Sequence, residues 1–294
     1  MPPPETRCGH VALAGRPNVG KSSLMNALIG QHLAMVSPKA QATRLPVTGL
    51  RSEGTTQFIF HDLPGLLDPK YLLQERMRAL ALEGLGRADL ILHLHPAADA
   101  PAPAFHEEAG LSTPPIVPVL VVYTKADLAD GAPSGAGGAG GIAVSVTTGE
   151  GLPALLAAME PHLPRRPFEY DPEDIGTQPL RFFVVEYLRE AAFDLLGQEV
   201  PYSFTAEVDE FRESTDPVYI RATLFVERNS QKGILIGEHG QTIKELGRRA
   251  RTRLEDLIGG RVYLETWVKV LPKWRKNPAQ LSRFGFHDDP KERA

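Results

Sequence analysis

The chain has 294 residues, 42% of them hydrophobic and 23% charged, with a net charge of −4, which describes an ordinary globular protein of one or two domains. Its one cysteine, Cys8, excludes an intrachain disulfide and a CxxC metal cluster, and this thiol is expected to be a small buried residue. The N-terminus lacks the apolar segment of a signal peptide and the longest apolar run, residues 116–123, is too short to span a bilayer, so a cytoplasmic protein is expected.

Strands and helices alternate over the first half of the chain. Helical patterns follow Gly20 and recur at about 71–87 and 151–159, and strands are predicted at 9–14, 56–61, 89–95, 116–123 and 142–146. This alternation is typical of an α/β fold with a mostly parallel sheet and helices on both faces. Residues 130–141, DGAPSGAGGAGG, are of low complexity and predict a flexible loop.

The second half has a different order of elements. Four prolines and several charges mark residues 164–179 as a linker. Beyond it the patterns predict a smaller α+β domain, with a helix at about 180–196, strands near 203–212 and at 218–228, a helix–loop–helix region at 230–257 and a strand at 262–270.

The expected division of the chain follows from these patterns. It places the α/β domain at 7–163, the linker at 164–179, the α+β domain at 180–286 and a tail at 287–294. Charge is also divided unevenly, because Arg228–Arg283 holds 13 Lys or Arg against 5 Asp or Glu. A basic region in an otherwise acidic protein favours a polyanionic partner, and a solvated helix face is the alternative.

A phosphate-binding loop lies between the first strand and the first helix. GRPNVGKS at 15–22 matches GxxxxGK[ST], whose backbone N–H groups surround phosphates at a helix N-terminus. Lys21 should reach the β- and γ-phosphates and Ser22 should hold Mg²⁺. The nucleotide contacts expected here are Gly15, Arg16, Pro17, Asn18, Val19, Gly20, Lys21, Ser22 and Ser23.

A carboxylate and a glycine follow the strand at 56–61. Asp62 in DLPG is placed to hold Mg²⁺, commonly through water, and Gly65 leaves room for the γ-phosphate. DxxG alone is a weak pattern, and it gains weight from the phosphate loop before it. Leu63, Pro64 and Leu66 complete the contacts expected at this motif.

Two further motifs indicate a guanine nucleotide. Asp127 in TKAD can accept the ring N–H and the exocyclic amino group of guanine, donors that adenine lacks, so it would select GTP over ATP. The stem of Lys125 can lie along the base plane. SVTTGEG at 145–151 lies at a strand end, where a backbone N–H can meet the guanine oxygen. The contacts expected here also include Thr124, Ser145, Val146 and Thr147.

With these four motifs in order, the sequence resembles the translation-factor-related GTPases. The resemblance maps the Mg²⁺-binding threonine of the first switch to Thr43 in QATR, so Ser22, Thr43 and Asp62 are the expected Mg²⁺ ligands. Thr124 departs from the asparagine that is usual in the family, but it keeps a hydroxyl. This departure would change nucleotide affinity more than specificity.

Leu66 occupies the position where Ras-like enzymes carry the glutamine that orients the attacking water. Hydrolysis is therefore slow, or the orienting group comes from elsewhere. In related GTPases with a hydrophobic residue at this position, a phosphate-loop asparagine helps to coordinate K⁺. The resemblance thus implies a K⁺ site at Asn18, whose alternative role is to shape the loop. The expected catalytic residues are Asn18, Lys21, Thr43 and Gly65.

A second glycine-bracketed loop lies at Gly237–Gly240, within GILIGEHGQTIK. A GxxG loop between two helices of a small α+β domain is typical of the KH fold, in which it clamps about four nucleotides of a single strand. GxxG alone is weak, because helices often end in glycine. The expected RNA contacts are Gln231, Lys232, Ile234, Ile236, Gly237, Glu238, His239, Gly240, Lys244 and Arg248.

Longer segments resemble the bacterial Era family, over about residues 8–286. They are QATRLPVTGLRSEG, EVPYSF, VERNSQKGILIGEHG and WVKVLPKWRKNP. The resemblance implies a P-loop GTPase domain and a type II KH domain, with GTP or GDP, Mg²⁺ and K⁺ as ligands. It also implies binding to the 3′ end of 16S rRNA, assistance in 30S subunit maturation, and control of RNA binding and release by the GTP state. A monomer is expected.

Three departures from the family and two other functions stay open at this point. QATR replaces the usual QTTR, DLPG replaces DTPG, and Glu238-His239 stands where the loop interior is usually basic, which puts RNA affinity in doubt. The chain can also be interpreted as a non-catalytic module in which the nucleotide is structural. A third interpretation is a switch that associates peripherally with the inner membrane, with its basic region facing anionic lipid.

Overall fold

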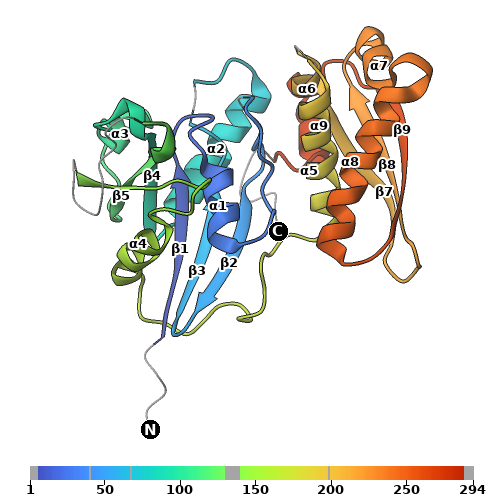
Figure 1. Cartoon of the computed structure of the whole chain (residues 1–294). Coiled ribbons are helices and arrows are strands. Elements are labelled where there is room, and N and C mark those ends of the chain that lie inside the picture. Colours follow the sequence, from blue (N-terminus) through green and yellow to red (C-terminus); the bar gives the residue numbers. More distant parts are fainter. Residues whose placement is uncertain (1–5, 40, 67, 130–139, 198, 288–294) are drawn as a thin grey trace. The chain divides into compact units, whose positions relative to one another are not determined.

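The structure is a computed structural model that describes residues 6–39, 41–66, 68–129, 140–197 and 199–287. The chain divides into two compact units, coloured along the sequence in Figure 1. The first unit comprises Met1–Ala34, Thr43–Pro69 and Met77–Thr177, and the second comprises Met35–Ala42, Lys70–Arg76 and Gln178–Ala294.

The first unit is built on a six-stranded sheet of order β2-β3-β1-β4-β5-β6. Only β2 runs antiparallel to its neighbour, β3, so the expected mostly parallel α/β fold is confirmed. The strands are β1 (Arg7–Ala14), β2 (Val47–Glu53), β3 (Thr56–Asp62), β4 (Leu90–Pro96), β5 (Val119–Thr124) and β6 (Gly141–Ala143). The helices are α1 (Lys21–Ile29), α2 (Leu72–Gly86), α3 (Phe105–Glu108) and α4 (Leu152–Met159).

Several boundaries differ from the sequence prediction. The strand predicted at 116–123 begins only at Val119, because Pro118 has no N–H to donate and uses only its carbonyl, which accepts from Ile91 N at 3.0 Å. The short helix α3 carries too few residues to show a period. Of the low-complexity loop predicted at 130–141, residues 130–139 lie outside the described residues. Cys8 is fully buried in β1, as expected.

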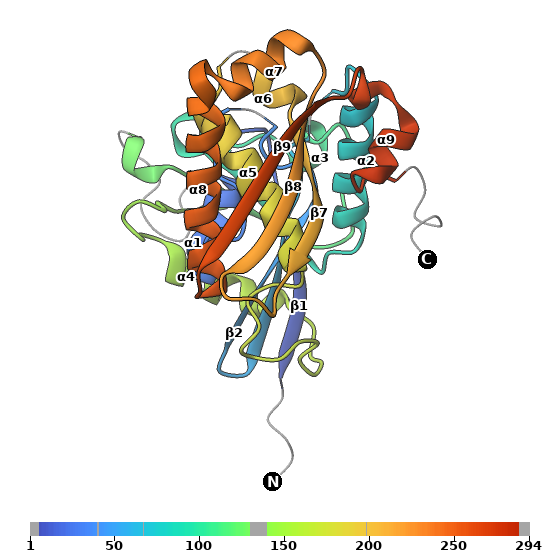
Figure 2. The ribbon, with the colours of Figure 1, turned by 90° about the vertical axis from the view of Figure 1, so that its right-hand side faces the viewer.

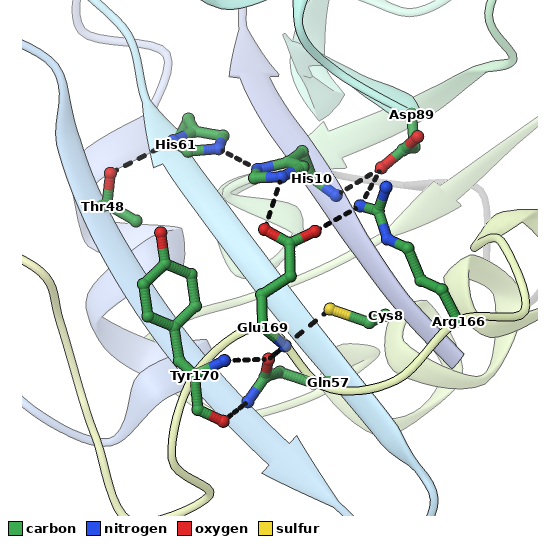
Figure 3. Close-up of polar contacts among 9 residues, drawn as sticks. All are labelled: Cys8, His10, Thr48, Gln57, His61, Asp89, Arg166, Glu169 and Tyr170. Atoms are coloured by element: carbon green, nitrogen blue, oxygen red, sulfur yellow. Dashed lines mark hydrogen bonds and ion pairs between the residues drawn. The ribbon is translucent and has the colours of Figure 1, made fainter. Parts of the chain in front are cut away.

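The segment after His162 follows the sheet of the first unit. Gln57, which is fully buried in β3, accepts hydrogen bonds through Oε1 from the N–H groups of Glu169 (2.9 Å) and Tyr170 (3.1 Å). Its Nε2 donates to the carbonyl of Tyr170 at 2.9 Å (Figure 3). A single amide side chain therefore satisfies three backbone groups of this segment.

A group of charged side chains holds the same segment. Arg166 Nη2 lies 2.9 Å from Asp89 Oδ2 and 3.0 Å from Glu169 Oε1, and Glu169 Oε2 lies 3.2 Å from His10 Nε2. The ring of His10 stacks on His61, with centroids 5.2 Å apart (Figure 3). These contacts join β1 and β3 to residues 166–169, so this part of the expected linker is fixed on the sheet.

Apart from two short helices, α6 (Val200–Ser203) and α9 (Pro278–Arg283), the second unit has the element order α-β-β-α-α-β expected of a type II KH fold. Its sheet has the order β7-β8-β9, with β7 antiparallel and β9 parallel to β8. Helix α5 packs against α8 and β7, as Figure 2 shows. The elements are α5 (Leu180–Leu195), α6 (Val200–Ser203), β7 (Thr205–Arg212), β8 (Val218–Val226), α7 (Asn229–Ile236), α8 (Gln241–Ile258), β9 (Val262–Val270) and α9 (Pro278–Arg283).

The second unit also includes two segments from earlier in the chain, Met35–Ala42 and Lys70–Arg76. In the first of these, Lys39 Nζ donates to the carbonyls of Phe193 and Leu196. Arg189 Nη2 donates to the carbonyl of Ala42 at 2.7 Å.

The segment Lys70–Arg76 contacts the rest of the second unit through Arg76 and Tyr71. Arg76 Nη1 donates to the carbonyl of Phe286 and lies 3.3 Å from Ser282 Oγ. Arg275 also lies over the ring of Tyr71, 5.3 Å from its centroid. Both segments thus make charge-assisted contacts inside the second unit.

Candidate nucleotide and RNA sites

The phosphate loop connects β1 to α1. At Gly15 the backbone has φ +147°, and an added Cβ would lie 2.5 Å from the carbonyl oxygen of Leu94, so only glycine fits there. Lys21 is buried, and its Nζ donates to the carbonyls of Gly15 (3.3 Å) and Arg16 (3.0 Å). Burial lowers the pKa of Lys21, while the charges of Asp62 and Glu108 act in the opposite direction. The amine is thus held against the backbone of the loop.

The three expected Mg²⁺ ligands come together from three parts of the first unit. Ser22 Oγ lies 2.6 Å from Asp62 Oδ2, and Thr43 Oγ1 lies 3.0 Å from each of these oxygens. An octahedral Mg²⁺ with ligands at about 2.1 Å has neighbouring ligand atoms about 3.0 Å apart. Oxygens are also the donors that Mg²⁺ prefers, so this set fits the ion in chemistry. The two separations from Thr43 also match the spacing of its ligands, whereas the 2.6 Å between Ser22 and Asp62 is a short hydrogen bond.

The end of β5 meets the phosphate loop through two side chains. Thr124, which is 3% exposed, donates from Oγ1 to the carbonyl of Val19 at 2.6 Å. Lys125, in the left-handed region with φ +57°, donates from Nζ to the carbonyl of Asn18 at 3.0 Å. The threonine that replaces the usual asparagine therefore binds the loop directly through its hydroxyl.

The segment after β6 lies beside TKAD. Val144 N donates to the carbonyl of Tyr123 at 2.8 Å, and Ala126 N donates to the carbonyl of Val144 at 3.2 Å. Ser145 is buried, and its Oγ accepts from Thr148 N at 3.2 Å, which shapes the turn. The remaining residues expected around a guanine base are exposed at this edge of the sheet, namely Asp127, Val146 and Thr147.

DLPG packs against the phosphate loop. An added Cβ on Gly65 would lie 3.0 Å from the ring of Pro17, so the glycine allows this approach. Leu63 and Leu66 are buried in an apolar cluster with Ala14, and Pro64 is also buried. Because the side chain of Leu66 lies in the core, the polar group that would orient water has to come from another residue. Asn18 is exposed, with φ +64°.

The second glycine loop ends α7 and begins α8. At Gly237 the backbone has φ +73°, and an added Cβ would lie 2.1 Å from Thr242 Oγ1. Between the glycines, Glu238 and His239 project into solvent, with side chains 87% and 85% exposed and 3.8 Å apart. Glu238 does not fold back from the loop, so its charge is exposed to solvent between the two glycines.

The expected RNA contacts occupy different positions around this loop. Ile234 and Lys244 are exposed, whereas Lys232 and Ile236 are half-buried. Gln231 is buried at the start of α7, where its Oε1 accepts from the N–H groups of residues 227 and 228 at 3.0 and 3.1 Å. The structure therefore uses the side-chain oxygen of Gln231 to cap the helix.

An acidic side chain of α8 that the sequence analysis did not single out, Glu245, pairs with two arginines of the same helix. Glu245 accepts from Arg248 Nε at 2.7 Å and from Arg249 Nε at 2.8 Å. These hydrogen bonds lower the pKa of Glu245 to about 2. The i, i+3 and i, i+4 spacing of the charges on a predicted helix is the signal that would have indicated these pairs.

The fold and the geometry of its motifs define a P-loop GTPase followed by a KH-type domain. Residues 10–125 match the 50S ribosome-binding GTPase family, and residues 199–275 match the KH domain family. A structure of Aquifex aeolicus Era, a point variant bound to GDP.AlF4−, is 33% identical to this chain, with a TM-score of 0.88. The match covers 96% of this chain and 100% of that one.

A second structure is of Era in complex with MgGDPNP and nucleotides 1506–1542 of 16S ribosomal RNA. It is also 33% identical, covers 96% of this chain and 100% of that chain, and has a TM-score of 0.87. The chain belongs to the Era family of GTPases. None of the helices in the described parts of the chain combines the length and the apolar character of a membrane span.

Proposed function

We propose that this chain is an RNA-binding GTPase that recognises the 3′ end of 16S rRNA and assists maturation of the 30S subunit. The observation that carries the proposal is the Era structure that holds nucleotides 1506–1542, because this chain matches its whole length at 33% identity. The family description that mentions the 50S subunit covers only residues 10–125. The part of the chain that would bind RNA lies outside that range, so the choice of subunit depends on the RNA-bound relative.

In this function the first unit binds GTP with Mg²⁺. The phosphate loop and Lys21 hold the phosphates, and the three converging oxygens of Ser22, Thr43 and Asp62 hold the ion. The two oxygen–oxygen distances of 3.0 Å from Thr43 support this assignment. Asp127 selects guanine. These roles explain why the four motifs lie at one edge of the sheet, at the carboxyl ends of β1, β3, β5 and β6.

Control of RNA binding by the nucleotide passes through the segment before Thr43. Thr43 donates a hydrogen bond to Asp62 of the nucleotide site, and the carbonyl of the preceding residue, Ala42, accepts one from Arg189 of the second unit. Lys39 donates to the carbonyls of Phe193 and Leu196, at the C-terminal end of α5, the helix that carries Arg189. A change at the γ-phosphate that moves Thr43 therefore acts on contacts inside the unit that carries the GxxG loop.

Fluorescence anisotropy with a short RNA that copies the 3′ end of 16S rRNA tests the RNA function. Binding is measured with GDP and with a non-hydrolysable GTP analogue at fixed salt, because phosphate contacts make affinity salt-dependent. The GTP analogue should tighten binding. In Lys39→Ala the affinity with GDP should stay the same while the effect of the GTP analogue shrinks.

A pair of glycine variants locates the RNA site. Gly240→Asp adds a charge to the loop, where an added Cβ meets no atom within 4 Å but φ is +76°. Gly237→Asp is less suitable, because its Cβ would collide with Thr242. Gly260→Asp is the matched control, since Gly260 is exposed in the same unit. Loss of RNA binding in Gly240→Asp but not in Gly260→Asp supports the proposal. Equal RNA binding by the wild type, Gly240→Asp and Gly260→Asp contradicts it.

We further propose that GTP hydrolysis depends on K⁺ bound at Asn18. The support is chemical, because Leu66 is buried among apolar side chains and a monovalent cation would supply positive charge beside the phosphates. Single-turnover GTP cleavage in K⁺ and in Na⁺ tests this idea. Faster cleavage in K⁺ is expected, and equal rates would disprove the K⁺ site. Absence of cleavage in both would favour a purely structural nucleotide.

We propose that the protein acts in the cytoplasm as a monomer. The basic region Arg228–Arg283 is assigned to RNA and not to lipid, because it contains a loop of the KH type. Sedimentation with vesicles that contain or lack anionic lipid separates the two partners. Stoichiometric, salt-sensitive sedimentation with anionic vesicles that competes with RNA would favour the membrane instead.

A further inference from the structure

Two histidines and a glutamate form a buried cluster in the first unit, outside the residues assigned to the nucleotide. His93 and His95 lie two residues apart on β4, so their side chains share one face of the sheet, and Glu108 ends α3 on that face. Their side chains are 1%, 6% and 4% exposed. Glu108 Oε2 lies 3.3 Å from His93 Nε2 and 3.4 Å from His95 Nδ1.

The tautomer of His95 leaves a lone pair on Nδ1, which faces the carboxylate of Glu108. His95 Nε2 lies 3.1 Å from the carbonyl oxygen of Asp99, which can only accept, so Nε2 carries a proton. In the neutral ring, Nδ1 then has no proton, and within the described part of the chain it makes no hydrogen bond. A buried lone pair thus faces a carboxylate oxygen. A histidine whose second nitrogen donates to a backbone carbonyl is also the usual arrangement of a metal ligand.

The distances from Glu108 Oε2 to the two ring nitrogens match a transition-metal site. Zinc binds imidazole nitrogen and carboxylate oxygen at about 2.0–2.2 Å, so neighbouring ligands of a tetrahedral ion lie about 3.3–3.5 Å apart. Both distances to Glu108 Oε2 are in this range, and one ligand atom from each residue lies within 4.8 Å of the others. Two imidazoles and one carboxylate also form a donor set that zinc uses in proteins.

We propose that His93, His95 and Glu108 bind a divalent transition-metal ion of the Zn²⁺ type. Three protein ligands leave a fourth position for water. Glu108 can bind the ion through Oε2 while its Oε1, 3.4 Å from Arg16 Nε, continues to face the phosphate loop. The ion would fix the four-residue helix α3 to β4, directly beside the loop that the first unit uses for nucleotide.

The competing explanation is an ion pair without metal, in which Glu108 is neutralised by an imidazolium and by Arg16. Metal binding by the full-length protein distinguishes the two. The protein is treated with chelator, desalted, and titrated with ZnCl2 in excess Mg²⁺ and GDP, so that the nucleotide site cannot take the added metal. Bound zinc is then measured by atomic emission after gel filtration. In parallel, CoCl2 is added, because four-coordinate Co²⁺ absorbs strongly in the visible range.

His95→Gln and Glu108→Gln each remove one ligand with little change of volume, and His162→Gln is the control, because His162 is exposed in the same unit. Cooperative unfolding of the chelated variants shows that they fold. We expect about one zinc per chain in the wild type and the control, and less than a tenth of that in the two ligand variants. Zinc at about 100 times its Kd should raise the Tm of the wild type and the control by roughly 5 °C and leave the Tm of the ligand variants unchanged. Absence of zinc from the wild type, or equal binding in the ligand variants, would overturn the proposal in favour of the ion pair.

Discussion

Replacing Thr124 by valine removes one hydroxyl from the nucleotide site and almost preserves the volume of the side chain. In the structure this hydroxyl donates to the carbonyl of Val19 at 2.6 Å, and Thr124 is 3% exposed. Water therefore cannot replace the lost donor without a rearrangement of the loop. A buried carbonyl left without its hydrogen bond costs about 1–3 kcal/mol.

This cost should be visible in both folding and binding. The free energy of unfolding of the first unit should fall by about 1–3 kcal/mol, which lowers its Tm by about 2–4 °C for each kcal/mol. Val19 belongs to the phosphate loop, so in the variant the nucleotide has to order the loop itself. GDP affinity should therefore fall by up to roughly 100-fold, which is the factor that corresponds to about 3 kcal/mol.

Urea unfolding followed by circular dichroism and isothermal titration calorimetry with GDP measure the two effects. Thr113→Val is the matched control, because Thr113 is an exposed threonine of the same unit and should change neither quantity. If Thr124→Val unfolds and binds GDP like the wild type, the hydroxyl does not hold the phosphate loop. The threonine would then be a neutral replacement for the asparagine that is usual in the family.

Trp274→Ala should lower the free energy of unfolding of the second unit by about 3–5 kcal/mol, because it removes a fully buried ring and the hydrogen bond from that ring to the carbonyl of Ser203 at 2.8 Å. A loss below 1 kcal/mol in urea unfolding would contradict this. Arg166→Ala should cost about 1 kcal/mol by the same assay, since its ion pairs are only partly screened, and an unchanged midpoint would mean that they add nothing. Glu245 has a pKa near 2 when folded and 4.5 as its ordinary value, so its contribution to stability is present above pH 4.5 and is lost as the pH falls toward 2. An NMR titration of this carboxyl should move toward 4.5 in Arg248→Ala, and an unchanged midpoint would refute the role of the arginine.

The motifs that could be recognised from the sequence are those whose chemistry is local. GRPNVGKS contains its own glycine turn, its lysine and the start of the helix that follows, so eight adjacent residues suffice to predict a phosphate loop. The strand at 262–270 and the helix at 180–196 were predicted almost to the residue, since each is a long stretch rich in apolar residues. In contrast, α3 spans only Phe105–Glu108, which is too short for such a pattern.

The same limit applies to the loop at Gly237–Gly240. Its two glycines were visible in the sequence, and Gln231 was expected among the RNA contacts there. The structure places this side chain inside the start of α7, where it caps backbone groups. Proximity in sequence indicates the neighbourhood of a site, whereas the direction of a side chain depends on the phase of the helix and on what packs against it.

By itself, the sequence determined the class of this protein, its nucleotide and its division into an α/β part and an α+β part, because each depends on residues that are neighbours in the chain. The tertiary structure alone decided which distant groups meet. It brings Thr124 to Val19, Arg189 to Ala42, and two histidines of β4 to a glutamate of α3. Such contacts depend on sheet register and helix packing, which no short pattern encodes, and it is there that the structure indicates a metal site beside the phosphate loop.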